Sequence, residues 1–283
     1  MIGIVFPSGP VQSTRFNQGL ELLGNLPFRI FPVKQADTEY LAGNDARRTE
    51  SLVSAINDEE ITIILAARGG YGAIRLDHKR LRTALHKKPK PLIGFSDITI
   101  LLELWRQAGV VSYHGPVLTQ LPLLETESLQ YALEFLANPS LKLCKMPKLS
   151  PLFQCGNQEE LAGELLGGNL ATFCSMTGTS CEPDYKDKLV ILEDVNEPPY
   201  KIDRMLNHLL LSTNIKQAKS LIMGSFSGCQ HPKGIFVDLI KKYHLNLPLF
   251  AGFPAGHQKS NFIFPYGKTV KFSLEKNIDS VDC

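Results

Sequence analysis

The chain has 283 residues, a length that favours two domains, and 43% hydrophobic and 20% charged residues are typical of a globular protein. The net charge of +2 and the pI near 8.1 are too balanced for a protein whose main partner is nucleic acid. No apolar run approaches the roughly 20 residues of a membrane helix, and the N-terminus lacks the pattern of a secretory signal. The six cysteines show no metal-ligand spacing and favour free thiols in a reducing compartment, so we expect a cytoplasmic protein.

The first half of the chain alternates segments typical of strands and of helices. The strand-like segments are short apolar runs at 2–6, 28–33, 61–66, 91–94 and 110–113. Segments with helical spacing lie between them at 15–23, 47–57 and 98–107. This alternation predicts a parallel sheet, on which ligands bind at the carboxyl ends of the strands.

A region with several prolines and little periodicity runs from about residue 138 to residue 160. We place the domain boundary here, with a first domain at 1–140, a linker at 141–160 and a second domain at 161–283. The second domain is expected to contain strands at 189–192, 220–223 and 248–251 and a helix at 202–211.

Ser96 is the first candidate catalytic residue. It lies in Gly94-Phe95-Ser96-Asp97-Ile98-Thr99, between a predicted strand and a predicted helix. A serine on such a turn is exposed at the top of the sheet, and the following amide can help to bind an oxyanion. Because Ile98 stands where a nucleophile elbow has its second glycine, and serine is also a favoured N-cap, the pattern alone leaves both roles open.

A glycine-rich segment, Arg68-Gly69-Gly70-Tyr71-Gly72, also follows a predicted strand. Glycine allows positive φ and a close approach of the backbone to a ligand, and free amides here can hold an anion or an oxyanion. The segment lacks the Gly-Lys-Ser/Thr of a P-loop and the spacing of a dinucleotide-binding fingerprint. A plain glycine turn is the alternative.

Acidic residues follow the predicted strand at 189–192. Glu193 lies where a carboxylate can orient an imidazole, and Asp194 and Glu197 are its rivals. A structural ion pair or a solvated loop explains these residues equally well when they are taken singly.

Histidine is the side chain best suited to general-base chemistry, because its ordinary pKa is near neutral. His257 follows the predicted strand at 248–251 on a glycine-flanked turn. His114, in Tyr113-His114-Gly115-Pro116, is the main competitor. A structural or exposed histidine is the alternative for both.

A series of short motifs extends over nearly the whole chain. They are Pro7-Ser8-Gly9, Ala42-Gly43-Asn44-Asp45-Ala46-Arg47, Ala67-Arg68-Gly69-Gly70-Tyr71-Gly72, Gly94-Phe95-Ser96-Asp97-Ile98-Thr99, His114-Gly115-Pro116, Gly167-Gly168-Asn169-Leu170, Leu192-Glu193-Asp194-Val195-Asn196-Glu197-Pro198-Pro199-Tyr200, Ile202-Asp203-Arg204-Met205-Leu206, Gly224-Ser225-Phe226-Ser227-Gly228 and Gly256-His257. In this order they resemble the LD-carboxypeptidase family, which also includes the microcin C self-immunity peptidases.

The resemblance implies an α/β fold, with a flavodoxin-like parallel-sheet N-terminal domain and a smaller β-rich C-terminal domain. It also implies a serine peptidase whose triad, by motif position, is Ser96, Glu193 and His257. For the oxyanion hole we expect the backbone amides of Gly70 and Asp97. This chemistry needs no metal or cofactor, and the sequence offers no His-Glu-x-x-His or comparable ligand cluster.

The substrate is implied by the family alone. LD-carboxypeptidases release the terminal D-alanine from the tetrapeptide of recycled cell-wall muropeptides, at an L–D peptide bond. Arg68 and Arg204 are candidates for binding the free carboxylate of the substrate, because arginine offers a bidentate fork, although a surface helix charge explains Arg204 equally well. The family also suggests a homodimer, and we expect no nucleic acid and no membrane as partners.

Two other functions stay open. A peptidase of the microcin-immunity type would cleave a peptidyl or aminoacyl nucleotide and should offer an aromatic platform for the base, but the stretch Glu197-Pro198-Pro199-Tyr200 is more similar to the cell-wall branch. A non-catalytic flavodoxin-like module would instead bind a phosphorylated small molecule through its glycine turns.

Overall fold

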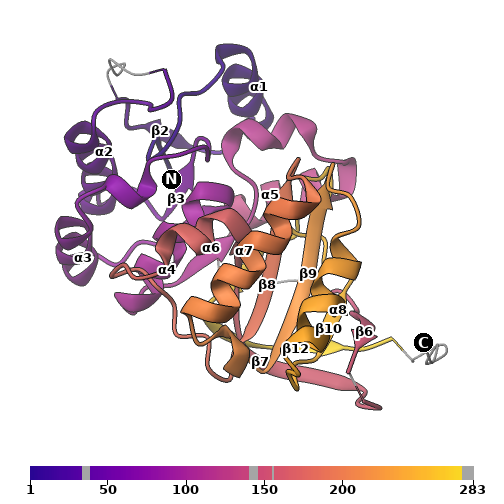
Figure 1. Ribbon diagram of the computed structural model, residues 1–283. Helices are drawn as coiled ribbons and strands as arrows, with labels where there is room; N and C mark the ends of the chain where they lie inside the picture. The colour runs from indigo at the N-terminus through magenta and orange to yellow at the C-terminus, as the bar shows by residue number, and fades with distance from the viewer. Residues whose placement is uncertain (34–38, 140–145, 155, 276–283) are drawn as a thin grey trace. The chain divides into compact units, whose positions relative to one another are not determined.

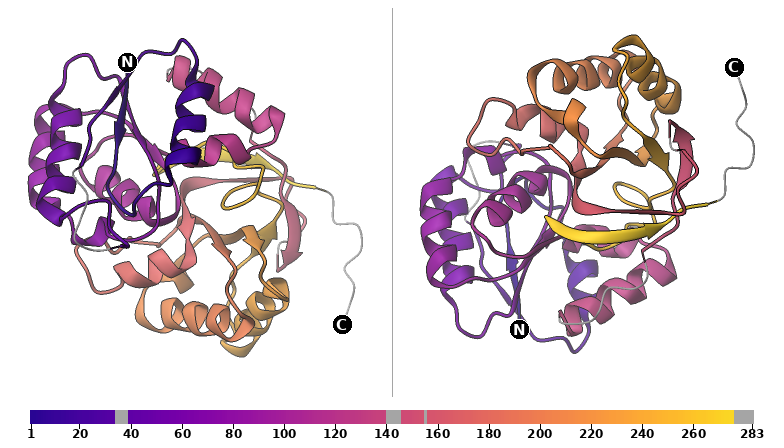
Figure 2. Two further views of the ribbon diagram at one scale, coloured as in Figure 1. Left: turned by 90° about the horizontal axis from the view of Figure 1, so that it is seen from above. Right: turned by 90° about the horizontal axis from the view of Figure 1, so that it is seen from below.

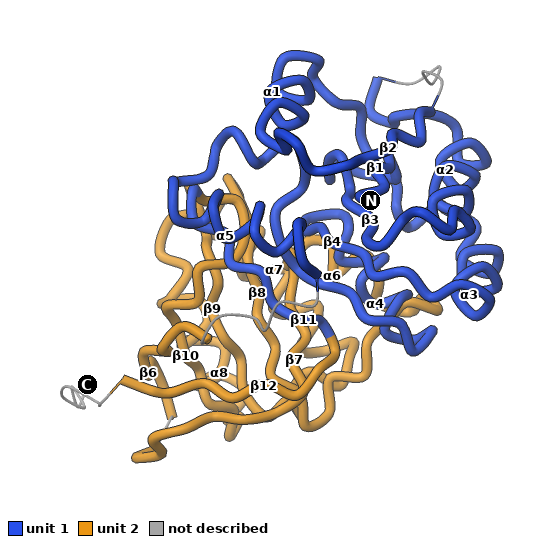
Figure 3. The backbone as a smooth tube through the Cα atoms, turned by 180° about the vertical axis from the view of Figure 1, so that it is seen from behind, with its two compact units in different colours: residues 1–143, 259–266 blue, residues 144–258, 267–283 orange. Residues whose placement is uncertain are grey.

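The computed structural model describes residues 1–33, 39–139, 146–154 and 156–275. The chain forms two compact units, residues 1–143 with 259–266 and residues 144–258 with 267–283 (Figure 3). Each unit is built on a sheet with helices beside it (Figure 1). The chain therefore passes from one unit to the other after residues 143, 258 and 266.

The sheet of the first unit has the strand order β11-β5-β4-β3-β1-β2. Its strands are β1 (Ile2–Val5), β2 (Phe28–Ile30), β3 (Ile63–Ala66), β4 (Leu92–Gly94), β5 (Ser112–His114) and β11 (Phe264–Tyr266). Neighbouring strands are parallel from β2 to β5, and β11 is antiparallel to β5. The parallel part has the 2-1-3-4-5 order of flavodoxin-like sheets, which confirms the expected fold.

The helices of the first unit lie in the connections between its strands. They are α1 (Ser13–Leu23), α2 (Asp45–Asn57), α3 (His78–Lys87), α4 (Thr99–Gln107) and α5 (Thr126–Ala137), with 3₁₀ helices η1 (Ala73–Arg75), η2 (Ser96–Ile98) and η3 (Leu118–Leu123). Helix α2 starts two residues before the predicted range, because the Asn44 side chain caps it by accepting a hydrogen bond from the Arg47 amide at 2.9 Å. Figure 2 shows α1 on one side of the sheet and α2 and α3 on the other.

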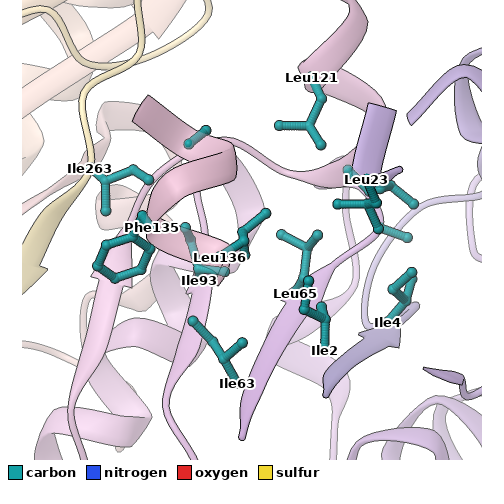
Figure 4. Packing of buried hydrophobic residues seen from close by; sticks show 13 residues of the cluster. Ile2, Ile4, Leu23, Ile63, Leu65, Ile93, Leu121, Phe135, Leu136 and Ile263 are labelled. Carbon is teal, nitrogen blue, oxygen red and sulfur yellow. The ribbon is translucent and has the colours of Figure 1, made fainter. Parts of the chain in front are cut away.

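The core of the first unit includes a cluster on the face of the sheet that α1, η3 and α5 cover (Figure 4). Alternate residues of the strands point into it, for example Ile2 and Ile4 of β1 and Ile63 and Leu65 of β3. Because these strands are buried on both faces, they read as continuous apolar runs in the sequence.

The sheet of the second unit has the strand order β12-β7-β8-β9-β10-β6. Its strands are β6 (Ser150–Phe153), β7 (Glu160–Asn169), β8 (Leu189–Val195), β9 (Ser220–Ser227), β10 (Leu249–Ala251) and β12 (Lys268–Ser273). Strands β7 to β10 are parallel, and β6 and β12 are antiparallel at the edges. Strand β6 falls in the predicted linker. It contains Pro151, and proline argues against a strand in the sequence although an edge strand tolerates it.

The second unit also contains helices α6 (Leu170–Met176), α7 (Pro199–Ser212) and α8 (Pro232–Lys242) and the 3₁₀ helix η4 (Ile215–Gln217). Figure 1 shows α7 and α8 in front of β8 and β9. Leu206 and Leu209 of α7, Phe236 of α8 and Leu221 of β9 line a small apolar space beneath them. The predicted helix at 202–211 lies inside α7, whereas α6 and α8 were not expected.

The segment 259–266 returns to the first unit, whereas the domain predicted from the sequence extended over the whole of 161–283. Its strand β11 pairs with β5, the Asn261 side chain donates to Gln120 at 2.8 Å, and the Tyr266 hydroxyl donates to Glu103 at 3.0 Å. These contacts join positions far apart in the sequence, so no change of composition marks the return.

Candidate active site

Ser96 lies two residues after β4, at the carboxyl end of a central parallel strand. Its φ of 63° is in the left-handed region, which a non-glycine residue adopts only when its surroundings impose it. The N-caps of η2 and α4 are Phe95 and Ile98, and neither makes a side-chain capping hydrogen bond within the described residues. The alternative role of Ser96 as a helix cap therefore lacks the contact that defines it, and a strained strand-to-helix turn remains.

Gly69 brings the glycine loop against Ser96. A Cβ atom at Gly69 would lie 2.8 Å from the Ser96 Cβ and 3.0 Å from its Oγ, so only glycine allows this approach. The next residue, Gly70, has a φ of 107°, which also favours glycine. Across the described parts of the chain, the backbone amides of Gly70 and Asp97 donate no hydrogen bond to another group.

The second unit brings Glu193 and His257 together. Glu193 lies near the end of β8, and His257 follows β10, two strands away in the same sheet. The His257 Nδ1 atom is 2.8 Å from Glu193 Oε2, and the Glu193 side chain is fully buried. An ionised Glu193 accepts the Nδ1 proton, which makes Nε2 the basic nitrogen of the ring.

The rival carboxylates make other contacts. Asp194 accepts hydrogen bonds from the Asn169 side chain at 3.0 Å and from the Ala171 amide at 3.1 Å, so it fixes the start of α6. Glu197 pairs with Lys201 at 3.2 Å. Of the three acids, Glu193 is the one for which the structure describes a hydrogen bond to His257.

Two glycines shape the turn that holds His257. Gly256 has a φ of 121°, and a Cβ there would lie 2.4 Å from Glu193 Oε2 and 2.6 Å from Ser225 Oγ. A Cβ at Gly224 would lie 3.1 Å from the Glu193 Cβ. The pairing of β8 with β9 shifts register between Leu192 and Asp194, which leaves the backbone irregular where Glu193 turns toward the histidine.

The electrostatics of the pair follow from burial and mutual attraction. Burial raises the pKa of the Glu193 carboxyl, and the hydrogen bond and charge of His257 oppose that rise. Burial alone would lower the pKa of His257, but the hydrogen bond and charge of Glu193, with the charge of Asp194, raise it above its ordinary value. The pair is therefore suited to stabilising an imidazolium that forms during a reaction.

His114, Arg68 and Arg204 are the remaining candidate residues, and each has different surroundings. His114 is fully buried in the first unit, stacked on Phe264 at 4.6 Å, which makes it a core side chain. Arg68 is exposed and donates to the Pro10 carbonyl beside the glycine loop. Arg204 is exposed on α7, with its guanidinium 5.8 Å from the centre of the Tyr200 ring.

Asn169 also belongs to the candidate site, although from the sequence it was part of a motif only and no role was predicted for it. Its side chain caps α6 by accepting from the Thr172 amide at 3.0 Å and also donates to Asp194. An asparagine just before a helix is a recognisable capping signal, but its contact with Asp194 joins two strands and has no local signal. The described residues contain no cluster of three or more His, Cys, Asp or Glu side chains that could hold a metal ion.

Known proteins match both halves of the chain. The family models for the LD-carboxypeptidase N-terminal and C-terminal domains match residues 2–115 and 162–272. The chain belongs to the LD-carboxypeptidase family. The murein tetrapeptide carboxypeptidase of Pseudomonas aeruginosa is 35% identical over 250 residues, which are 83% of this chain and 80% of that protein. Membership of this family makes the chain a peptidase.

Solved structures agree with this assignment. The crystal structure of muramoyltetrapeptide carboxypeptidase from Oxalobacter formigenes is 26% identical, with a TM-score of 0.80 over 97% of this chain and 95% of that one. The microcin C7 self-immunity protein in complex with aspartyl sulfamoyl adenosine is 20% identical, with a TM-score of 0.78 over 96% and 92%, and shows the same fold. Among the described residues of the chain, no helix has the length and apolar character needed to cross a bilayer.

Proposed function

We propose that the protein is a serine carboxypeptidase that releases the terminal D-alanine from cell-wall muropeptide tetrapeptides by hydrolysing an L–D peptide bond. The observation that carries this proposal is the 2.8 Å contact between His257 and the buried Glu193. A buried carboxylate that orients an imidazole is the acid–histidine part of a catalytic triad. Relatives named as murein and muramoyltetrapeptide carboxypeptidases support the choice of substrate.

Acylation starts with Ser96 as the nucleophile. His257 Nε2 takes the hydroxyl proton while Oγ attacks the carbonyl carbon of the scissile bond, and a tetrahedral intermediate forms. Glu193 stays ionised and stabilises the imidazolium. The imidazolium then gives its proton to the amine of D-alanine, which leaves, and the rest of the peptide remains as an ester on Ser96.

Deacylation repeats these steps with water in place of the serine. His257 takes a proton from the water, the resulting hydroxide attacks the ester, and the proton returns to Ser96 Oγ as the shortened peptide leaves. The amides of Gly70 and Asp97 would stabilise the oxyanion in both halves of the reaction. Arg68 and Arg204 are proposed to bind the substrate carboxylate.

The test incubates the purified protein with a cell-wall tetrapeptide and follows D-alanine by mass spectrometry, with Ser96→Ala alongside. We expect release by the wild type and a loss of roughly 10⁴- to 10⁶-fold in the variant. Equal release by both proteins would contradict a serine mechanism.

An aminoacyl sulfamoyl adenosine and an aminoacyl adenylate serve as a second substrate arm of the same test. Cleavage of the adenylate without release of D-alanine would replace the cell-wall substrate by a nucleotide conjugate. Binding of such compounds without any cleavage would favour the non-catalytic module.

A further inference from the structure

Two buried charged side chains of the first unit lie behind the glycine loop. Arg48 of α2 is fully buried, and the Asp97 residue is 6% exposed. Buried charges are costly unless other groups compensate them, so their partners indicate what they hold in place. Neither side chain has a role in the reaction proposed above, in which Asp97 contributes only its backbone amide.

Both side chains hold the same peptide group, the one that joins Gly72 to Ala73. Its carbonyl accepts from Arg48 Nη1 at 2.9 Å, and its amide donates to Asp97 Oδ2 at 2.9 Å. Because the carbonyl and amide of a trans peptide point in opposite directions, these two contacts fix the plane of the group. Gly72 has a φ of 124°, and a Cβ there would lie 2.8 Å from Arg48 Nη1, so glycine is required.

The same two side chains also hold the loop after β1. Arg48 Nη1 donates to the Pro7 carbonyl, and the Ser8 hydroxyl donates to Asp97 Oδ2 at 2.5 Å. Strands β1, β3 and β4 are neighbours in the sheet, and the three loops that follow them meet at Asp97.

The two loops are also joined directly beside the nucleophile. The Gly9 amide donates to the Gly69 carbonyl at 3.0 Å, and Gly69 is the residue that approaches Ser96. A shift of either loop would therefore displace Gly70, whose amide follows Gly69 in the chain.

We propose that Arg48 and Asp97 form a peptide clamp that positions the glycine loop, and with it the Gly70 amide, against Ser96. They are positioning residues, because they act through the backbone of the loop. The inference rests on the proposed serine-peptidase function, in which this loop supplies an oxyanion donor.

The chemistry of Asp97 suits a clamp that needs a carboxylate. Burial raises the pKa of Asp97, and the hydrogen bonds from Ser8 and Ala73, the charge of Arg48 and the Gly72 amide oppose that rise. An asparagine would keep one acceptor oxygen and replace the other by an NH₂ group. It would also remove the charge of Asp97 from near the buried Arg48, which would keep its ion pair with Asp45.

The test compares Asp97→Asn and Ser8→Ala with the wild type in two assays. One assay gives kcat and KM for D-alanine release, and the other gives the rate of Ser96 phosphonylation by a fluorophosphonate. For Asp97→Asn we expect kcat and the phosphonylation rate to fall by roughly 10- to 100-fold, with KM within about threefold. Ser8→Ala removes one hydrogen bond and should shift both rates in the same direction by a smaller factor, even if Asp97→Asn fails to fold.

Asp58→Asn is the matched control for a general loss of stability. Asp58 is the C-cap residue of α2 and precedes β3, so it lies toward the amino ends of the strands, away from the glycine loop. Its carboxylate pairs with Arg29. This variant should be less stable than the wild type but keep its kcat. A purely structural role for Asp97 would lower the melting temperature in the same way and leave kcat unchanged.

The outcomes separate the clamp from the proposed function. Wild-type rates in both Asp97→Asn and Ser8→Ala would overturn the clamp. If the wild type is phosphonylated at Ser96 but releases no D-alanine, slower labelling of Asp97→Asn supports the clamp while the proposed substrate fails. A wild type that is inactive in both assays would contradict both proposals.

Discussion

At Gly256, the backbone conformation and the surroundings both exclude a side chain. The φ of 121° is unfavourable for any other residue, and the position of a Cβ is already taken by Glu193 Oε2 and Ser225 Oγ. The residue after Gly256 is His257, so the requirement for glycine and the orientation of the imidazole belong to one turn. Ser96 shows the reverse case, because a non-glycine residue is held at positive φ where the proposed mechanism requires a hydroxyl.

We therefore expect Gly256→Ala to reduce kcat by about 100-fold, because a displacement of about 1 Å at a catalytic pair has an effect of this size. It should also lower the melting temperature. Gly234→Ala is the matched control, since a Cβ there meets no atom within 4 Å, and its helical position should make alanine neutral or stabilising. Normal activity of Gly256→Ala would show that the turn does not control the Glu193–His257 pair.

The charge of Asp194 raises the pKa of His257 by electrostatic attraction. His257 must be neutral to take a proton from Ser96, so activity should rise with pH as the imidazole loses its proton. The pKa of His257 is raised, which places this rise at a higher pH than for an ordinary histidine. Asp194 is one cause of the raised pKa, after Glu193.

Removing that charge in Asp194→Asn should lower the pKa of His257 and move the rise in kcat/KM to lower pH. A pH profile of D-alanine release measures the midpoint. Asp238→Asn, an exposed carboxylate of α8, is the control and should leave the midpoint in place. A midpoint that does not move in Asp194→Asn would contradict this electrostatic account.

At the scale of elements, the candidate site residues lie at or near the carboxyl ends of parallel strands. The glycine loop follows β3, Ser96 follows β4, and Glu193 lies near the end of β8. Short apolar runs that end in glycine, serine or acid are visible in the sequence, so these positions were predictable. The edge strand β6 and the helix α6 were not predicted from the sequence, because β6 contains proline and α6 is short. Helix α8 was not predicted either.

Contacts across elements left no pattern in the sequence. The side chain of Asp97 reaches Ser8 and Ala73, which are separated from it by 89 and 24 residues. Arg48 looks like an ordinary charged residue of an amphipathic helix, yet it is fully buried. Such roles depend on which loops meet at one edge of the sheet, and local periodicity does not contain that information.

The return strand β11 should contribute measurably to stability. Tyr266→Phe removes the hydrogen bond to the buried Glu103, which then keeps Arg106 as its partner. We expect a loss of about 1–3 kcal/mol in the free energy of unfolding, measured by urea denaturation. Tyr71→Phe, at a residue that is 47% exposed, should stay within about 0.5 kcal/mol of the wild type. Equal stability of Tyr266→Phe and the wild type would contradict the role of this contact.

At the scale of the whole molecule, the proposed catalytic residues are divided between two units. Ser96 belongs to the first, and Glu193 and His257 belong to the second. The chain passes between the units after residues 143, 258 and 266, and the last two passages follow His257 closely. The proposed mechanism requires His257 to activate Ser96, so activity would depend on residues from both units.

The most direct test of that claim is the rate at which a fluorophosphonate labels Ser96, measured by mass spectrometry of the labelled peptide in the wild type and in His257→Gln. The account predicts labelling of the wild type at Ser96 and labelling of the variant at least about 100-fold more slowly, because the serine loses its general base. Equal rates in the two proteins, or labelling of another residue, would contradict it.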